Sequence, residues 1–335
     1  MTSITVLTAD FPSCAVPDSG AFVHTLWTEV QRQGSHVDIV SPTRFPIAVE
    51  RRGIEDSLRV TRPRFLSPGV AQPFPKARRN LSHRRWIESA KKVAENQRLP
   101  DFFFGQFLHP AGEAAAVLGD YFERPSFVEI SEDTTDRWVI SRSTRDVQSL
   151  LHRFTGIVTV SNGLSEAISE FGVSAERVIV SPNGIDHGTF SPGDRSASRA
   201  NLNLPTDLLL TATVARHVVD KGVQVVADAL AHVADSAGLF VGAGPTPPVG
   251  STVMRAQAVA HNSVAEYLSA ADIFVLPSLA EGCANAVLEA MAVGLPLVLS
   301  DRPFMREIAD ESFAIFVDPT SVDSVAEAIA QLKAD

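Results

Sequence analysis

The sequence contains few cysteines, no long apolar run and no excess of positive charge. Cys14 and Cys283 are its only cysteines in 335 residues, too few for a disulfide framework and suited to a reducing compartment. No segment approaches the roughly 20 consecutive apolar residues that a membrane-spanning helix needs. Met1–Asp10 lacks the basic start of a signal peptide and has the pattern of a first strand. These absences favour a globular protein of the cytoplasm.

Several functional signatures are also missing. Neither the cysteines nor the histidines show metal-site spacing, so no metal is expected. The first strand-to-helix turn, at Gly20, lacks the G-x-G-x-x-G fingerprint, which disfavours a nicotinamide dehydrogenase. The net charge of −10 argues against nucleic acid as a partner. The charge is uneven, however, because residues 44–98 carry +9 and the remainder −19, which predicts a local anion-seeking surface.

The length and the periodicity predict two α/β domains. A chain of 335 residues is long enough for two cores of ordinary size. Short apolar strands alternate with helical patterns in both halves, which is typical of doubly wound parallel sheets. We expect a first domain over residues 1–185, a linker rich in Gly, Pro, Ser and Asp over 186–205, and a second domain over 206–335.

The most informative stretch is residues 277–300, PSLAEGCANAVLEAMAVGLPLVLS. A buried strand ends at Leu276, a loop carries Glu281, a helix is predicted over Ala284–Ala292, and Gly294 ends that helix. Glu281 therefore lies at the carboxyl end of a parallel strand, where ligands of open α/β sheets bind.

The entrance of this helix is suited to an anion. The backbone N–H groups of Cys283, Ala284, Asn285 and Ala286 are expected to point outward and, with the helix dipole, to favour a phosphate. Glu289 lies further along, on an otherwise apolar face, so its carboxylate needs a partner. A purely structural alternative is that Glu281 caps the helix and Glu289 pairs with an arginine.

This stretch resembles the E-x7-E signature of the retaining, nucleotide-sugar-dependent glycosyltransferases of family 4. The resemblance implies the GT-B fold, two Rossmann-like parallel-sheet domains that face each other across a cleft. It also implies that Glu281 faces the donor sugar and that Glu289 binds the ribose hydroxyls of the nucleotide. Gly282 and residues 283–286 would then belong to the donor site.

Other segments extend the resemblance. Arg216 and Lys221, in ARHVVDKG, match the R-x(4)-K-G element, whose cations neutralise the donor diphosphate. Gly242-Ala-Gly-Pro245 matches a G-x-G-P turn. Asn183, in SPNGID, matches the P-N-G-x-D segment that ends the first domain and is a candidate cleft residue. Relatives usually have glycines at the first turn, where the backbone approaches the donor phosphates and the acceptor. Only Gly20 matches, and the resemblance makes it a candidate donor-binding residue.

The first half matches less closely. Phe107-Leu-His-Pro-Ala-Gly112 resembles an H-x-x-P-x-G loop, so His109 is a candidate cleft residue, although it also suits an ordinary helix entrance. Relatives commonly have H-G-x-D after the next strand, whereas this chain has Ile130-Ser-Glu-Asp133, in which only Asp133 matches. Relatives also continue with a further helix after the position of Asp335.

The basic stretch, residues 74–98, allows three interpretations. Between Lys76 and Lys92 it interleaves Trp86 and aliphatic residues with seven cations. The helix could pack Trp86 on the domain core and leave a solvated basic face. Alternatively, it could lie peripherally on the anionic inner face of the cell membrane, or it could recognise an anionic acceptor.

The resemblance implies an enzyme that moves a hexosyl group from a UDP- or GDP-sugar to a hydroxyl acceptor, with retention at the anomeric carbon and without a metal or cofactor. The alternatives are a GT-B epimerase or phosphorylase, which the order of the motifs disfavours, and a catalytically silent relative that binds nucleotide sugar and supports a partner glycosyltransferase. The altered loop at 130–133 is the feature that keeps the silent relative open.

Overall fold

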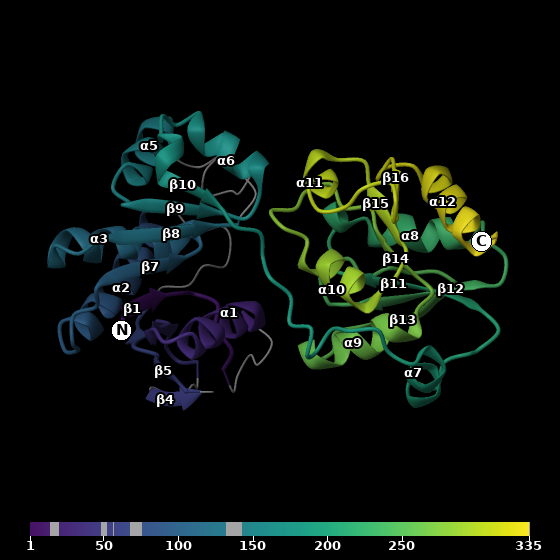
Figure 1. The fold of residues 1–335 in the computed structure, drawn as a ribbon, viewed down its shortest axis with the longest axis horizontal. Helices are drawn as coiled ribbons and strands as arrows, with labels where there is room; N and C mark the ends of the chain where they lie inside the picture. Colours follow the sequence, from purple (N-terminus) through teal and green to yellow (C-terminus); the bar gives the residue numbers. More distant parts are fainter. Residues whose placement is uncertain (14–19, 48–51, 56, 68–75, 132–142, 335) are drawn as a thin grey trace. The chain divides into compact units, whose positions relative to one another are not determined.

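The computed structural model describes residues 1–13, 20–47, 52–55, 57–67, 76–131 and 143–334. Its contacts divide the chain into two compact units, Met1–Pro182 and Asn183–Asp335. Each unit is an α/β sandwich built on one large sheet (Figure 1). Among the described residues, no helix combines the length and the apolarity needed to cross a bilayer.

The first unit contains an eight-stranded sheet with the order β10-β9-β8-β7-β1-β2-β5-β4. All neighbouring strands are parallel except the edge pair β4 and β5, which is antiparallel. A separate short pair joins β3 and β6. The strands are β1 (Ser3–Leu7), β2 (His36–Val40), β3 (Thr43–Arg44), β4 (Arg52–Glu55), β5 (Leu58–Thr61), β6 (Arg64–Phe65), β7 (Phe102–Gln106), β8 (Ser126–Ile130), β9 (Gly156–Thr159) and β10 (Val178–Val180).

Helices cover both faces of this sheet. On one face α1 packs Val23 and Trp27 against Ile4 and Val6 of β1. On the other face α2, α3, α5 and α6 share a core with Phe103 and its neighbours. The helices are α1 (Ala21–Arg32), α2 (Lys76–Ala94), α3 (Glu113–Phe122), α5 (Thr144–Leu151) and α6 (Asn162–Ser169), and the short turn η1 (Leu108–Gly112) joins β7 to α3.

The second unit contains a six-stranded, wholly parallel sheet with the order β13-β12-β11-β14-β15-β16. Its strands are β11 (Leu209–Val214), β12 (Ser236–Val241), β13 (Val253–Gln257), β14 (Ile273–Leu276), β15 (Leu297–Ser300) and β16 (Ala314–Val317). Its helices are α7 (Arg195–Asn201), α8 (Val223–Leu230), α9 (His261–Ala270), α10 (Asn285–Val293), α11 (Pro303–Arg306) and α12 (Val322–Ala334).

The apolar run of β14 is continuous because both faces of this sheet are covered. Phe274 and Leu276 pack with α9 and α10, whereas Ile273 and Val275 pack with α8 and α12. A strand buried on both faces has no polar side to alternate with the apolar one. The parallel sheet expected from the sequence is therefore observed, and its helices lie in two layers around it.

Local sequence signals mark two helix ends. Ser161 caps α6, because its hydroxyl accepts a hydrogen bond from the Leu164 amide at 3.3 Å. Gly294 ends α10 in the left-handed conformation, with φ of 88°, and the helix cannot continue past such a residue.

The segment expected to be a linker, residues 186–205, is structured and packs on the second unit. Phe190 and Leu204 are buried in its core. Arg199 of α7 is also buried, and it donates to the Ala270 carbonyl at 2.9 Å and to Asp272 Oδ2 at 2.6 Å. The same carboxylate accepts from the Leu210 amide at 2.8 Å. Arg199 and Asp272 thus join α7 to the beginnings of β11 and β14.

The basic stretch forms α2, whose side chains are described from Leu81 onward. Trp86 and Ala90 are buried in the core of the first unit, which matches the first of the three interpretations. Arg84, Arg85 and Lys92 are exposed. The aromatic residue that would anchor the helix in a bilayer is therefore used for packing, and the structure gives the membrane contact no support.

Candidate functional site

The candidate site of the second unit lies at the topological switch of its sheet. The chain leaves β11 for β12 and β13 on one side, and later returns so that β14 pairs with the other side of β11. The carboxyl ends of β11 and β14 therefore form the switch point of the sheet, the place where open α/β sheets generally bind ligands. The loops after these two strands carry the R-x(4)-K-G element and Glu281.

Lys221 and Glu281 meet at this switch point. Lys221 Nζ lies 2.6 Å from Glu281 Oε1 and donates to the Ala280 carbonyl at 2.8 Å. Only 13% of the Lys221 side chain and 15% of the Glu281 side chain are exposed. The two loops are also joined by the Leu279 amide, which donates to the Asp220 carbonyl at 2.8 Å. The structure thus brings together two residues that sequence analysis assigned to the diphosphate and to the sugar.

Glycines allow three loops to pack backbone to backbone at this point. A Cβ on Gly242 would lie 1.9 Å from the Ala215 carbonyl oxygen, and one on Gly244 would lie 2.1 Å from the His217 carbonyl oxygen. Gly222 has φ of 67° and lies against Pro277. Any larger residue would separate these loops, so the G-x-G-P turn after β12 fixes the shape of the loop that carries Arg216 and Lys221.

The entrance of α10 has no side-chain cap. Glu281 pairs with Lys221 instead of capping the helix, so this part of the structural alternative is wrong. Asn285 is the first helical residue, its side-chain Oδ1 accepts from Asn183 Nδ2 at 2.7 Å, and its amide donates to the Cys283 carbonyl at 3.0 Å. The Asn285 amide is therefore not one of the outward-pointing amides expected at 283–286. Gly282, Cys283 and Ala284 form the loop before the helix, and Ala286 lies in its first turn.

Glu289 is buried and its partner is a histidine. Its Oε1 lies 3.0 Å from His261 Nε2, at the beginning of α9, and the Glu289 side chain is 8% exposed. The His261 ring also contacts the buried ring of Phe190, with centroids 5.4 Å apart. The arginine of the structural alternative is thus replaced by His261, which sequence reasoning missed because it lies 28 residues away.

Arg216 and His217 are neighbours with opposite environments. Arg216 is exposed. The His217 side chain is buried beneath the loop, and its Nε2 has no hydrogen-bond partner among the described residues. Burial lowers the pKa of His217 and keeps its imidazole neutral. The positive potential of this loop therefore comes from Arg216 and Lys221.

The remaining predicted residues belong to the first unit. Gly20 precedes α1 with φ of 68°, and a Cβ there would lie 2.4 Å from the Asp10 carbonyl oxygen, so this turn requires glycine. His109 lies in η1, directly after β7. Asp133 falls outside the described residues.

A buried carboxyl lies at the carboxyl end of β8. Glu129 pairs in register with Gln106 of β7, and Gln106 Oε1 accepts from Trp27 Nε1 at 3.1 Å. Burial raises the pKa of Glu129, and the nearby polar side chains of Gln106 and Ser131 oppose that shift only in part. This acid was not singled out by its sequence, because a lone glutamate in a strand carries no motif.

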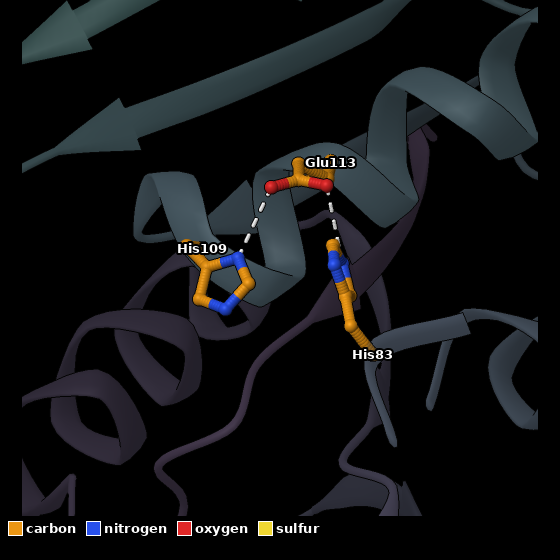
Figure 2. A group of neighbouring side chains, drawn as sticks. All are labelled: His83, His109 and Glu113. Atoms are coloured by element: carbon orange, nitrogen blue, oxygen red, sulfur yellow. Dashed lines mark hydrogen bonds and ion pairs between the residues drawn. The ribbon is translucent and has the colours of Figure 1, made fainter. Parts of the chain in front are cut away.

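His109 belongs to a cluster with His83 of α2 and Glu113 of α3 (Figure 2). His109 Nδ1 lies 3.1 Å from Glu113 Oε1, and His83 Nε2 lies 3.2 Å from Glu113 Oε2. The two carboxylate oxygens each face one imidazole ring. Among the described residues, this is the one group of three His, Cys, Asp or Glu side chains arranged to hold a metal ion. Sequence spacing missed it because its members lie on three separate elements.

Comparison with known proteins finds glycosyltransferase family models that match both halves of the chain. The model of the family described as Glycosyltransferase Family 4 matches residues 19–189, and that of Glycosyl transferases group 1 matches residues 207–335. TuaC of Bacillus subtilis, described as a candidate glycosyltransferase of teichuronic acid biosynthesis, is 26% identical over 97% of this chain and 87% of its own. The D-inositol 3-phosphate glycosyltransferase of Mycobacterium tuberculosis is 31% identical over 42% of this chain and 33% of its own.

Solved structures show the same architecture. Sucrose-phosphate synthase from Thermosynechococcus elongatus superimposes with a TM-score of 0.82 at 19% identity, covering 100% of this chain and 90% of its own. HepE of Anabaena, solved with UDP and glucose, has a TM-score of 0.74 at 15% identity with the same coverage. The predicted GT-B fold, two parallel-sheet α/β domains, is thereby confirmed. Because one family model alone matches more than half of the chain, the protein belongs to glycosyltransferase family 4 and is a glycosyltransferase.

Proposed function

We propose that the protein is a retaining glycosyltransferase of glycan biosynthesis that moves a hexosyl group from a UDP- or GDP-sugar to a hydroxyl acceptor, without a metal at the diphosphate. The observation that carries this proposal is the contact of 2.6 Å between Lys221 and Glu281 at the β11–β14 switch. In a nucleotide diphosphate sugar, the terminal phosphate is bonded directly to the anomeric carbon through one oxygen. A cation for the phosphate and a carboxylate for the sugar hydroxyls must therefore lie within a few ångströms of each other.

The charges of the loops suit the leaving diphosphate. Lys221 and the exposed Arg216 would neutralise the charge that grows as the glycosidic bond breaks, and the entrance of α10 would add its amides and dipole. Preorganised charge of this kind is commonly worth several kcal/mol of barrier. These groups would do what a divalent metal does in other transferases, so no metal is required at this point.

Glu289 would bind the ribose hydroxyls of the nucleotide. Its carboxylate is held by His261 from the neighbouring helix, so only a small part of it remains open to a ligand. Asn183 and Asn285 lie at the entrance of α10 and would contact the donor from the same side. In the first unit, Gly20 remains a candidate donor-binding residue and His109 a candidate cleft residue.

Retention would follow from attack on the face that the diphosphate leaves. Glu281 is paired with Lys221 and Glu289 with His261, so neither is offered as a nucleophile. The acceptor oxygen would bond to the anomeric carbon as the bond from that carbon to the phosphate oxygen breaks. The acceptor proton would pass to the departing phosphate oxygen. One displacement without a covalent sugar–enzyme intermediate then suffices.

The relatives support a nucleotide-sugar donor and a glycan acceptor. TuaC is described in teichuronic acid biosynthesis, and HepE was solved with UDP and with UDP-glucose. A membrane contact through the exposed cations of residues 74–98 is a separate prediction that these likenesses do not address.

The proposal is tested by nucleotide binding followed by transfer. Thermal shift with UDP, GDP and ADP should show stabilisation by one of them, because a ligand that binds only the folded state raises stability by mass action. Release of that nucleotide from its sugar, with and without pooled acceptors, should then show turnover, and NMR of the product should show retention. A bound nucleotide without any turnover would support the silent relative, and a nucleotide bound away from Arg216 and Glu281 would contradict the assigned site.

A further inference from the structure

We propose that His83, His109 and Glu113 form a binding site for a divalent transition metal of the zinc type, in the first unit. This site goes beyond the proposed function, since Lys221 and Glu281 belong to the second unit and the proposed transfer step does not use it.

The three ligands are carried by elements that share one core. His83 lies one turn before Trp86 on α2, and Trp86 and Ala90 are buried together with Ala111 of η1 and Ala114 of α3. The backbones that carry His83, His109 and Glu113 are therefore fixed by packing before any ion arrives. Because these backbones are already ordered, little conformational entropy is lost when an ion binds.

The separations of the ligand atoms match a metal site. Tetrahedral zinc with bonds of about 2.0–2.2 Å places neighbouring ligand atoms about 3.3 Å apart. The contacts of His109 Nδ1 and His83 Nε2 with the two oxygens of Glu113 measure 3.1 and 3.2 Å. The two contacts are made to different oxygens of Glu113, and one ligand atom from each residue lies within 4.8 Å of the others, so the side chains would close further around an ion. Without a metal, Glu113 Oε1 shares a hydrogen bond of 3.1 Å with His109 Nδ1, and Glu113 Oε2 lies 3.2 Å from His83 Nε2; a bound metal would replace both contacts.

The donor set selects the class of ion. Two imidazoles and one carboxylate are a ligand set of catalytic zinc sites, which keep a further position for water or substrate. Nitrogen ligands favour Zn²⁺, Co²⁺ and Ni²⁺ over Mg²⁺ and Ca²⁺. The side chains of His83 and Glu113 are each 12% exposed and that of His109 is 34% exposed, so the site is shielded but open on the His109 side.

The cluster lies where a ligand could reach an open coordination position of the metal. η1 directly follows β7, so His109 lies at the carboxyl edge of the parallel sheet, where ligands of such folds bind. A metal there would present its free position to an oxygen donor, such as a hydroxyl or a carboxylate, on that edge.

The test uses the full chain after removal of metals with EDTA. Titration with Zn²⁺ by calorimetry should show one equivalent bound with a Kd below about 1 μM. Titration with Co²⁺ should produce the visible absorption of a four- or five-coordinate ion, and Mg²⁺ should not compete. Failure of the wild-type chain to bind Zn²⁺ or Co²⁺ would overturn the proposal.

Variants distinguish metal binding at this cluster from metal binding by scattered surface histidines. Glu113→Gln retains the size of the side chain and should weaken Zn²⁺ binding by more than about 100-fold, beyond the usual cost of removing an outer partner of a metal ligand. His109→Ala should do the same. His152→Ala, at an exposed position of the same unit, is the matched control and should bind as the wild type does. Circular dichroism in EDTA checks that each variant is folded. Wild-type affinity in Glu113→Gln would show that the cluster is only a hydrogen-bonded network.

Discussion

Variants of Lys221 and Glu281 should change the stability of the protein and its transfer activity in different ways. The contact between Lys221 Nζ and Glu281 Oε1 is 2.6 Å long and both side chains are largely buried, so each charge is stabilised mainly by the other and only in small part by water. We consider Lys221→Met, Glu281→Gln and the double variant. Each single change leaves one charge without its partner, and we expect the free energy of unfolding to fall by about 2 kcal/mol, less than the cost in a fully buried pair.

The double variant should cost no more than either single one, because two neutral side chains of similar size replace the pair. The coupling energy of the cycle is then about 2 kcal/mol, in the range of a charge-assisted hydrogen bond. Activity should behave differently. Under the proposed function each single change removes a group that binds the donor, so transfer should fall about 10²–10³-fold, and the double variant should not recover it.

The assays are urea unfolding for stability and nucleotide release with product analysis for transfer. Lys92→Met, at an exposed position of the first unit, is the control and should change neither. Additive losses of unfolding free energy would mean that the two side chains do not interact. Near-normal transfer by Lys221→Met would refute the role assigned to the cation.

Three further predictions follow from other contacts. Glu289→Ala should raise the KM for the donor and leave His261 in place, and an unchanged KM in initial-rate assays would contradict ribose binding by Glu289. Gly244→Ala should abolish the thermal shift caused by the nucleotide, because its Cβ would overlap the His217 carbonyl at 2.1 Å; a normal shift would show that the loop tolerates the change. Burial raises the pKa of Glu129 above its ordinary 4.5, so its contribution to stability is full below that value and is lost as pH rises through the higher folded value. As the pH rises from 5 to 8, the melting temperature of Glu129→Gln should therefore increase relative to that of the wild type. A difference in melting temperature that stays constant over this range would argue against a neutral buried acid.

The sequence predicted the strands that are buried on both faces. The strand expected to end at Leu276 is β14 (Ile273–Leu276), which ends at that residue and is buried on both faces. Long apolar runs bounded by turn residues carry this signal by themselves. The short strands between residues 43 and 65 were not predicted, because runs of two to four residues interrupted by arginines show no period.

The site was predicted as a set of residues but not as a set of contacts. Lys221 and Glu281 were assigned from a family resemblance, and their direct pairing depends on β14 returning to the free side of β11. Strand order is a property of the fold and is not written in local periodicity. The same reason explains why His261 beside Glu289, and His83 beside Glu113, could not be foreseen from spacing.

The placement of Arg199 bears on how the second unit should be expressed by itself. A fragment beginning at residue 206, the limit that composition suggests, would lose Phe190, Leu204 and the guanidinium, and would leave Asp272 without its cation at the base of two central strands. A fragment beginning at Asn183 keeps all of them. Crystallisation or screening with an isolated half should therefore begin with the longer fragment, because the shorter one lacks part of its own interior.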